Sequence, residues 1–246
     1  MRPARILLGC ALLLQACGTP EGTASGPGDD RPAVNLREVP GRAPHPFRQF
    51  DQNVFHDTLL VQTSFDLGDS TYVMVASNVE ETFEGLRLIR YRFRPDSTVE
   101  RMAWSAPAYD SWTMLPTFFP LDTVHPDDAN WVLANYGEKE SWGQKVMLLD
   151  FEFMDVGFMD VALPERVMEE DTLRLKRRNV APYMRYNEHG DTAVWLFACD
   201  SVYLYDDQAG TLDQVVHASR LRYTFEANEG LALWVDGRKR LLKRPA

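Results

Sequence analysis

The sequence predicts an all-β fold. Many short segments are rich in branched and aromatic residues, and Gly, Asp, Asn and Pro punctuate them at short intervals. No window of a dozen residues keeps the 3.6-residue period of an amphipathic helix. Loose strand–turn–strand units recur over residues 71–104, 130–168, 192–217 and 221–243. The predicted architecture is therefore an antiparallel meander of short strands, built as a small or incomplete propeller or as a β-sandwich.

Eight segments have the composition of strands, and two others favour short helical pieces, Gln49–His56 and Pro164–Glu170. A turn is expected at Pro126–Asp128, and strands are not expected where prolines interrupt residues 107–120. The predicted strands are Leu59–Phe65, Thr71–Asn78, Leu86–Phe93, Trp131–Tyr136, Lys145–Phe153, Ala193–Ala198, Ser201–Tyr205 and Leu231–Val235.

Two internal patterns predict local pairing. In Leu86–Phe93 the apolar residues change phase between Leu88 and Ile89, which is typical of a β-bulge. The runs Val194–Phe197 and Val202–Tyr205 are continuously apolar, so both faces of each are expected to be covered. Because only four residues separate these two runs, we expect them to form a hairpin in the centre of the core.

Near the C-terminus, Asp236-Gly237 is a strong signal for a two-residue hairpin turn. Five of the last nine residues are basic, which is typical of a charged edge strand; a small anion site is the alternative. The turn predicts the cross-strand pairs Val235 with Arg238, Trp234 with Lys239, Leu233 with Arg240 and Leu231 with Leu242.

The first seventeen residues have the pattern of an export signal. Arg2 and Arg5 form a basic region, and the apolar run Ile6–Leu14 has nine residues, whereas a membrane-spanning helix needs about twenty. Leu14-Gln15-Ala16-Cys17 resembles the lipobox of bacterial lipoproteins. The resemblance implies a signal peptide over residues 1–16, cleavage before Cys17 and a lipid on Cys17 that anchors the protein to a membrane. An ordinary secretory signal is the alternative.

The lipoprotein resemblance also implies a location. Gly18 follows the cysteine, where an Asp would resemble an inner-membrane retention signal of Gram-negative lipoproteins. The expected location is therefore the cell envelope, at the periplasmic or surface face of the outer membrane.

The net charge of the chain limits which classes of partner it is expected to bind. Removing Arg2 and Arg5 with the signal leaves 24 basic and 36 acidic residues, a formal charge of −12. Such a chain is not expected to bind nucleic acid, whose phosphates require clustered Lys and Arg. With Cys10 removed and Cys17 acylated, Cys199 is the remaining thiol, so no intrachain disulfide is expected and Cys199 is interpreted as a small buried residue.

Residues 17–46 are predicted to be a lipidated, flexible tether. Residues 18–46 contain six prolines, five glycines and no aromatic residue, so they bury little apolar surface. As a flexible chain this stretch spans roughly 30 Å. One β-rich domain is then expected over residues 47–246.

Aromatic residues are concentrated in the middle of the chain, where residues 104–142 hold four of the six tryptophans. Aromatic side chains in a β-domain pack in its core or, where loops expose them, stack on sugar rings or contact a partner protein. The candidate binding residues are Tyr109, Trp112, Trp131 and Trp142, with Trp142 in the loop Gly137–Gly143 as the first to test.

Two short motifs suggest an enzymatic alternative. Gly68-Asp69-Ser70 resembles the nucleophile block of GDSL-type serine esterases, and Asp122-Thr123-Val124-His125-Pro126 resembles their Asp-x-x-His-Pro block. The resemblance implies Ser70 as nucleophile, His125 as base and Asp122 as the orienting carboxylate. That family places its serine between a strand and a helix, whereas residues 71–76 are predicted to be a strand.

A metal site is a further hypothesis for the same loop, because Asp122, His125, Asp127 and Asp128 carry suitable ligand atoms. Asp127 and Asp128 follow Pro126, however, and fit turn and cap positions better, so neither a metal nor a cofactor is predicted.

The sequence therefore favours a lipid-anchored, non-enzymatic domain of the cell envelope that binds a protein or glycan partner through loops around residues 104–142. A serine esterase that uses Ser70, His125 and Asp122 is the alternative.

Overall fold

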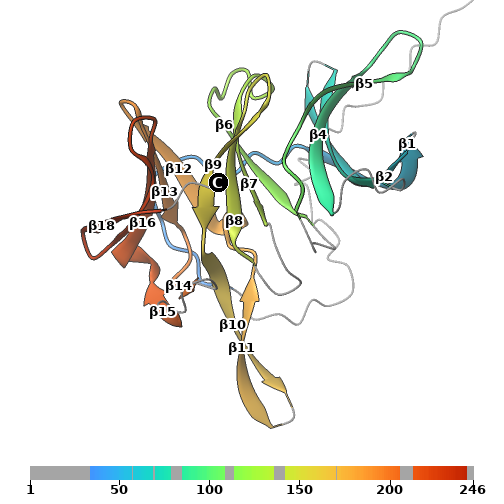
Figure 1. Cartoon of the computed structure of the whole chain (residues 1–246). Helices are drawn as coiled ribbons and strands as arrows, with labels where there is room; N and C mark the ends of the chain where they lie inside the picture. Colours follow the sequence, from blue (N-terminus) through green and yellow to red (C-terminus); the bar gives the residue numbers. More distant parts are fainter. Residues whose placement is uncertain are drawn as a thin grey trace, which may run out of the picture. The chain divides into compact units, whose positions relative to one another are not determined.

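The fold is nearly all β, as the sequence predicts. The computed structural model describes residues 34–56, 58–68, 70–78, 85–108, 114–135, 142–169, 171–205 and 213–242. These residues form antiparallel strands and two short 3₁₀ turns, Ala181–Tyr183 and Ala218–Arg220 (Figure 1). The strands make four sheets, none of which closes into a barrel. No helix in the described residues is long and apolar enough to cross a membrane.

The first and second sheets follow the chain strand by strand, whereas the third and fourth each combine strands from separated parts of the sequence. The first sheet has the order β1-β2-β3-β4-β5, formed by β1 (Arg48–His56), β2 (Leu59–Gly68), β3 (Thr71–Asn78), β4 (Leu86–Phe93) and β5 (Val99–Trp104). The second has the order β6-β7-β8-β9, formed by β6 (Pro116–Pro120), β7 (Asn130–Asn135), β8 (Gln144–Leu149) and β9 (Phe153–Met159).

The remaining two sheets contain the C-terminal half of the chain. The third has the order β11-β10-β14-β15, formed by β10 (Val161–Glu169), β11 (Thr172–Arg178), β14 (Ser201–Tyr205) and β15 (Asp213–His217). The fourth has the order β12-β13-β16-β17-β18, formed by β12 (Met184–His189), β13 (Thr192–Phe197), β16 (Leu221–Glu226), β17 (Gly230–Val235) and β18 (Arg238–Leu241).

Three local predictions are wrong, all for the same reason. Gln49–His56 lies in β1 and Pro164–Glu169 in β10, so neither forms the predicted helical piece. Pro116–Pro120 forms β6 although prolines were expected to exclude a strand. Sheet pairing overrides weak local preference in each case, and β6 tolerates its prolines because it lies at the edge of its sheet.

The second sheet has both faces buried. Phe119, Trp131 and Leu133 belong to the largest apolar cluster, which they share with residues of the fourth sheet. Val132 and Ala134, which alternate with them along β7, belong to a second cluster shared with the first sheet. Every residue of β7 is therefore buried, which explains its continuous apolar composition.

The change of apolar phase between Leu88 and Ile89 in β4 has a similar cause, since both residues are buried on opposite faces of the first sheet. Leu88 packs in the second cluster, whereas Ile89 packs in a third cluster on the other face of the first sheet. The bulge predicted at this point of β4 does not form, because Leu88 and Ile89 pair regularly with β3. The register shift in the pairing with β5 leaves out Met102, which is a residue of β5. The phase change between Leu88 and Ile89 therefore reflects two covered faces.

The hairpin predicted in the centre of the core does not form. β13 pairs with β12 and β16, whereas β14 pairs with β10 and β15. The connection through Cys199 passes from one sheet to another, and Cys199 makes an isolated bridge to Leu36. Both runs are apolar although they lie in different sheets, so their shared composition did not require them to pair.

The C-terminal hairpin is confirmed. Val235 pairs with Arg238 and Leu233 with Arg240, while the amide of Leu242 donates to the carbonyl of Leu231 over 2.8 Å. Asp236 and Gly237 have positive φ values of 51° and 76°, as a type I′ turn requires. The Lys239 ammonium lies 5.6 Å from the centre of the Trp234 ring.

The compact unit begins at Val34, earlier than the predicted boundary at residue 47. Part of the predicted tether is bound to the domain, where backbone hydrogen bonds join Arg37 to Ala198, Arg42 to Tyr186 and His45 to Phe118. We call residues 34–46 the strap. Because backbone pairing needs no apolar side chains, the composition of this segment did not predict that it pairs with the domain. Cys17 and its lipobox lie outside the described residues.

Candidate functional site

The hairpin of β10 and β11 extends beyond its sheet. β10 pairs with β14 only through Val161 and Ala162, but with β11 from Leu163 to Glu169. In Figure 1 the two strands continue together past β14 and β15. We call residues 163–178 the ribbon. A two-stranded ribbon has two faces that the rest of its sheet does not cover, and here the two faces differ in chemistry.

One face of the ribbon carries matched charges. Glu165 pairs with Arg178 at 3.3 Å. Glu169 pairs with Arg174 at 3.7 Å and also contacts Lys176. The contact with Lys176 lowers the pKa of Glu169. Each cation on this face therefore has a carboxylate from the neighbouring strand of the same ribbon.

The other face is apolar and exposed. Met168 is paired with Leu173 across the ribbon, and Arg166 with Leu175. Met168, Leu173 and Leu175 are 66%, 60% and 42% exposed. Arg177 comes two residues after Leu175 and therefore shares this face. Exposed apolar side chains that adjoin one another and a cation are typical of an interaction surface.

At the base of the ribbon the same face carries an aromatic cluster. Tyr203 and Tyr205 stack with ring centres 5.9 Å apart, and the Arg177 guanidinium lies 5.2 Å and 4.0 Å from these centres. The alternate residues Val202 and Leu204 point into the main core instead. The period of β14 thus places its two tyrosines on the face that is turned away from the core.

Trp142 completes this cluster. It is half-buried and packs against the small cluster of Ala162, Tyr203 and Tyr205. The next residue must be glycine, because a Cβ on Gly143 would lie 2.9 Å from the Tyr205 hydroxyl oxygen and closer still to the ring of Phe158. The tight backbone contact at Gly143 therefore fixes where Trp142 lies. We call Trp142, Tyr203, Tyr205 and Arg177 the aromatic cluster.

A buried amide next to Trp142 has an unused acceptor. The side-chain nitrogen of Gln144 donates to the Trp142 carbonyl over 2.6 Å and to the side-chain oxygen of Asn179 over 3.1 Å. Gln144 is fully buried, yet its side-chain oxygen has no hydrogen-bond partner. A buried acceptor without a donor costs about 1–3 kcal/mol, which an ordered water can offset.

The predicted binding residues have different outcomes. Trp131 is 5% exposed and packs edge-on against Trp195 in the main core, so it does not lie at a surface. Trp142 lies at the surface cluster described above. Tyr109 and Trp112 lie outside the described residues. A further tryptophan, Trp104, is 58% exposed but belongs to β5 in a different sheet.

The second predicted site is partly assembled. His125 Nδ1 lies 3.2 Å from Asp122 Oδ2, and the Asp122 hydrogen bond raises the pKa of His125. The other carboxylate oxygen accepts the amide of Val124, which is the first cause of a lowered Asp122 pKa, with His125 second. Both side chains are more than half exposed. The pair leaves Nε2 of His125 available as a base.

The turn that carries Ser70 lies against this loop. A Cβ on Gly68 would be 3.5 Å from Cβ of Asp127, so the β2–β3 turn contacts the loop after His125. Ser70 is exposed and has a φ of 59°. It lies between two antiparallel strands, not between a strand and a helix as in the esterase family.

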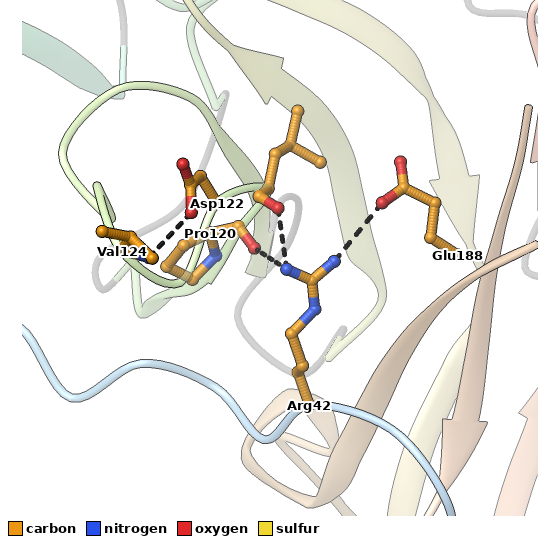
Figure 2. A network of polar contacts seen from close by, with 6 residues as sticks. Arg42, Pro120, Asp122, Val124 and Glu188 are labelled. Carbon is orange, nitrogen blue, oxygen red and sulfur yellow. Dashed lines mark hydrogen bonds and ion pairs between the residues drawn. The ribbon is translucent and has the colours of Figure 1, made fainter.

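Arg42 of the strap holds the start of this loop. Its Nη1 donates to the carbonyls of Pro120 and Leu121 over 3.1 Å and 2.7 Å (Figure 2). Its Nη2 lies 3.5 Å from Glu188 on β12, and its guanidinium lies 4.8 Å from the centre of the Tyr186 ring. One side chain thus ties the strap to the second and fourth sheets.

Two other chemical hypotheses gain no support. Among the described residues no group of three or more His, Cys, Asp or Glu could hold a metal ion, so Asp127 and Asp128 do not join Asp122 and His125 in one. Burial raises the pKa of the Cys199 thiol to about 11. A thiol that stays protonated at neutral pH is a poor nucleophile.

Sequence reasoning missed most of the aromatic cluster and the ribbon. Tyr203 and Tyr205 were assigned to a strand with both faces in the core, and β11 was not predicted. The available signal was the alternation Leu173, Leu175, Arg177, which has the period of a strand with one apolar face.

Comparisons of this chain with protein-family models, curated proteins and solved structures found no match.

Proposed function

We propose that the protein is a lipid-anchored binding module of the bacterial cell envelope that binds a glycan or an envelope protein through the aromatic cluster. The observation that carries the proposal is the half-buried ring of Trp142, which packs on the tyrosine cluster that Arg177 also contacts. A partly exposed aromatic ring near a cation suits a ligand that has an apolar ring face and hydroxyl or anionic groups. The anchor is proposed from the lipobox alone.

The cluster has the physical properties that such binding needs. The stacked tyrosines beneath Trp142 and the tight contact at Gly143 restrict the movement of the indole ring, so little side-chain entropy is lost on binding. Arg177 adds a cation with several donors to a domain whose overall charge is negative. At this cluster an anionic or hydroxyl-rich group of the partner is therefore favoured over a cationic group.

The test is capture of partners from detergent-solubilised envelopes by the full chain. Trp142→Ala should reduce capture at least tenfold, because aromatic residues dominate binding energy at interfaces. Trp104→Ala is the matched control, since Trp104 is an exposed tryptophan in another sheet. Equal capture by wild type and Trp142→Ala, in a protein that still folds, would refute the site.

Acylation needs its own measurement. Metabolic labelling with a palmitate analogue should mark the wild-type chain, and Cys17→Ser should abolish the mark because the lipobox cysteine is the acceptor. A wild-type chain without label would contradict the anchor without affecting the binding site.

A serine esterase is the second candidate. Its support is that two motifs far apart in the sequence meet, with the turn of Ser70 against the loop of the Asp122–His125 pair. In this hypothesis His125 Nε2 removes the Ser70 proton, and Asp122 orients the ring. A fluorophosphonate should then label Ser70, and Ser70→Ala should abolish labelling.

Ser97 provides the control for that test. It is another exposed turn serine with a left-handed backbone, φ 65°, so it shares the exposure and backbone strain of Ser70. Ser97→Ala should leave labelling unchanged. No labelling of the wild-type chain at Ser70 would exclude the esterase hypothesis.

A further inference from the structure

We propose that the ribbon is a self-association site, in which β11 pairs antiparallel with β11 of a second copy of this chain about a twofold axis at Leu175. The inference rests on the ribbon and does not depend on the aromatic cluster or the lipid anchor.

The first argument is the open edge. β11 is the outermost strand in the described part of its sheet, and its residues from Thr172 to Lys176 are exposed. An edge strand presents unpaired amide and carbonyl groups to any strand that can approach. A two-stranded ribbon is also marginally stable in water, so two further strands would stabilise it.

The second argument is that the usual protection of such an edge is weak here. Charged side chains normally block edge-to-edge pairing. In β11, Arg174 and Lys176 contact Glu169, and Arg178 contacts Glu165, all within one ribbon. Because these cations are neutralised in the same chain, they oppose a second ribbon much less than free cations would.

The third argument is the pattern of side chains about the twofold axis. With Leu175 opposite Leu175 of the second copy, Leu173 lies opposite Arg177, and Arg174 opposite Lys176. The exposed apolar residues Leu173 and Leu175 of both ribbons then form one continuous row, with Arg177 at each end. An isologous interface needs this kind of self-complementary patch.

The two ends of the ribbon also favour this orientation. The exposed Asp171 lies at the turn and is separate from the ion pairs of Glu165 and Glu169, whereas Arg177 lies at the base of β11. Antiparallel pairing brings the acidic turn of each copy to the basic base of the other. Parallel pairing would place turn beside turn. The same acidic turn opposes insertion of the ribbon into an anionic membrane.

The pairing is tested by cysteine cross-linking in the full chain. Leu175→Cys places two thiols opposite each other, so mild oxidation should give a covalent dimer on a non-reducing gel. Leu173→Cys is the matched control, on the same strand and face and similarly exposed. Its two copies would be offset by four residues, about 13 Å along the strand, beyond the reach of about 7 Å for a disulfide.

A second measurement avoids engineered thiols. Sedimentation of the full chain in detergent should show a concentration-dependent dimer, which Leu175→Asp weakens roughly 30-fold by placing two carboxylates together at the axis. Circular dichroism shows whether that variant keeps its fold. We expect that it does, because Leu175 is 42% exposed.

The outcomes separate the alternatives. Cross-linking at position 175 but not at 173 supports the proposal. Cross-linking at both positions equally, at neither, or at 173 alone overturns it. Binding of the monomeric protein to vesicles of anionic phospholipid, lost in Leu175→Asp, would also overturn it by assigning the ribbon to lipid. None of these results bears on the Trp142 capture experiment.

Discussion

The guanidinium of Arg177 lies over the ring of Tyr205, 4.0 Å from carbon to ring centre, at the point where the ribbon meets its sheet. This contact joins the aromatic cluster to the apolar face of the ribbon. Both lie on the side of the sheet turned away from the main core. Because Tyr203 and Tyr205 are buried, the accessible part of this side is Trp142 and the exposed apolar residues of the ribbon.

Removing the Arg177 cation should have a small but measurable effect on the stability of the fold. Arg177→Ala is expected to lower the free energy of unfolding by about 1 kcal/mol through lost contact with the two tyrosines. Urea denaturation measures the change. Arg174→Ala, which removes an exposed ion pair on the opposite face, should cost less than about 0.5 kcal/mol. Equal losses in the two variants would show that the tyrosine contact adds nothing.

The Arg42 contacts predict how the strap is held. Arg42→Ala removes the donors to the Pro120 and Leu121 carbonyls, so the free energy of unfolding should fall by about 2 kcal/mol. Hydrogen exchange at the amides of Arg42 and His45 should accelerate. Glu38→Gln, at an exposed strap position, is the control. Unchanged exchange in Arg42→Ala would mean that backbone pairing alone holds the strap.

The Asp122–His125 pair predicts a shifted titration. The carboxylate stabilises the charged imidazolium, so NMR should give His125 a pKa above its ordinary value, and Asp122→Asn should lower the pKa toward that value. Since the folded pKa is raised, the interaction is complete below the ordinary pKa and is lost as pH rises through the raised one. Identical titration curves for the two proteins would disprove the pairing in solution.

Cys199 should be inert in the folded protein. With its pKa raised to about 11 by burial, the thiol stays protonated at pH 8 and is closed to solvent. Iodoacetamide should therefore modify Cys199 only in denaturant, as read by peptide mass spectrometry. Rapid modification of the native protein would show that the connection between β13 and β14 opens.

The sequence predicted the strand content and the local pairing better than the assembly of the sheets. Asp236-Gly237 specified its hairpin because the turn fixes the register of the adjoining residues. The runs containing Trp195 and Tyr203 had the same apolar composition, but composition does not state which strand a run pairs with. Long-range pairing placed them in different sheets.

Trp131 and Trp142 show that prediction of the site from the sequence has the same limit. They lie in one aromatic segment, yet Trp131 packs in the core and Trp142 lies at the surface. Their environments depend on contacts with Trp195 and Tyr205, which come from distant parts of the chain. Residue type alone could identify both as candidates but could not distinguish them.

Site-specific photo-cross-linking in intact cells tests the binding surface most directly. With a benzophenone amino acid in place of Trp142, the proposal predicts a discrete adduct with an envelope component, and none with the same group in place of Trp104. An adduct at position 104 alone, or at neither position, would contradict binding through the aromatic cluster.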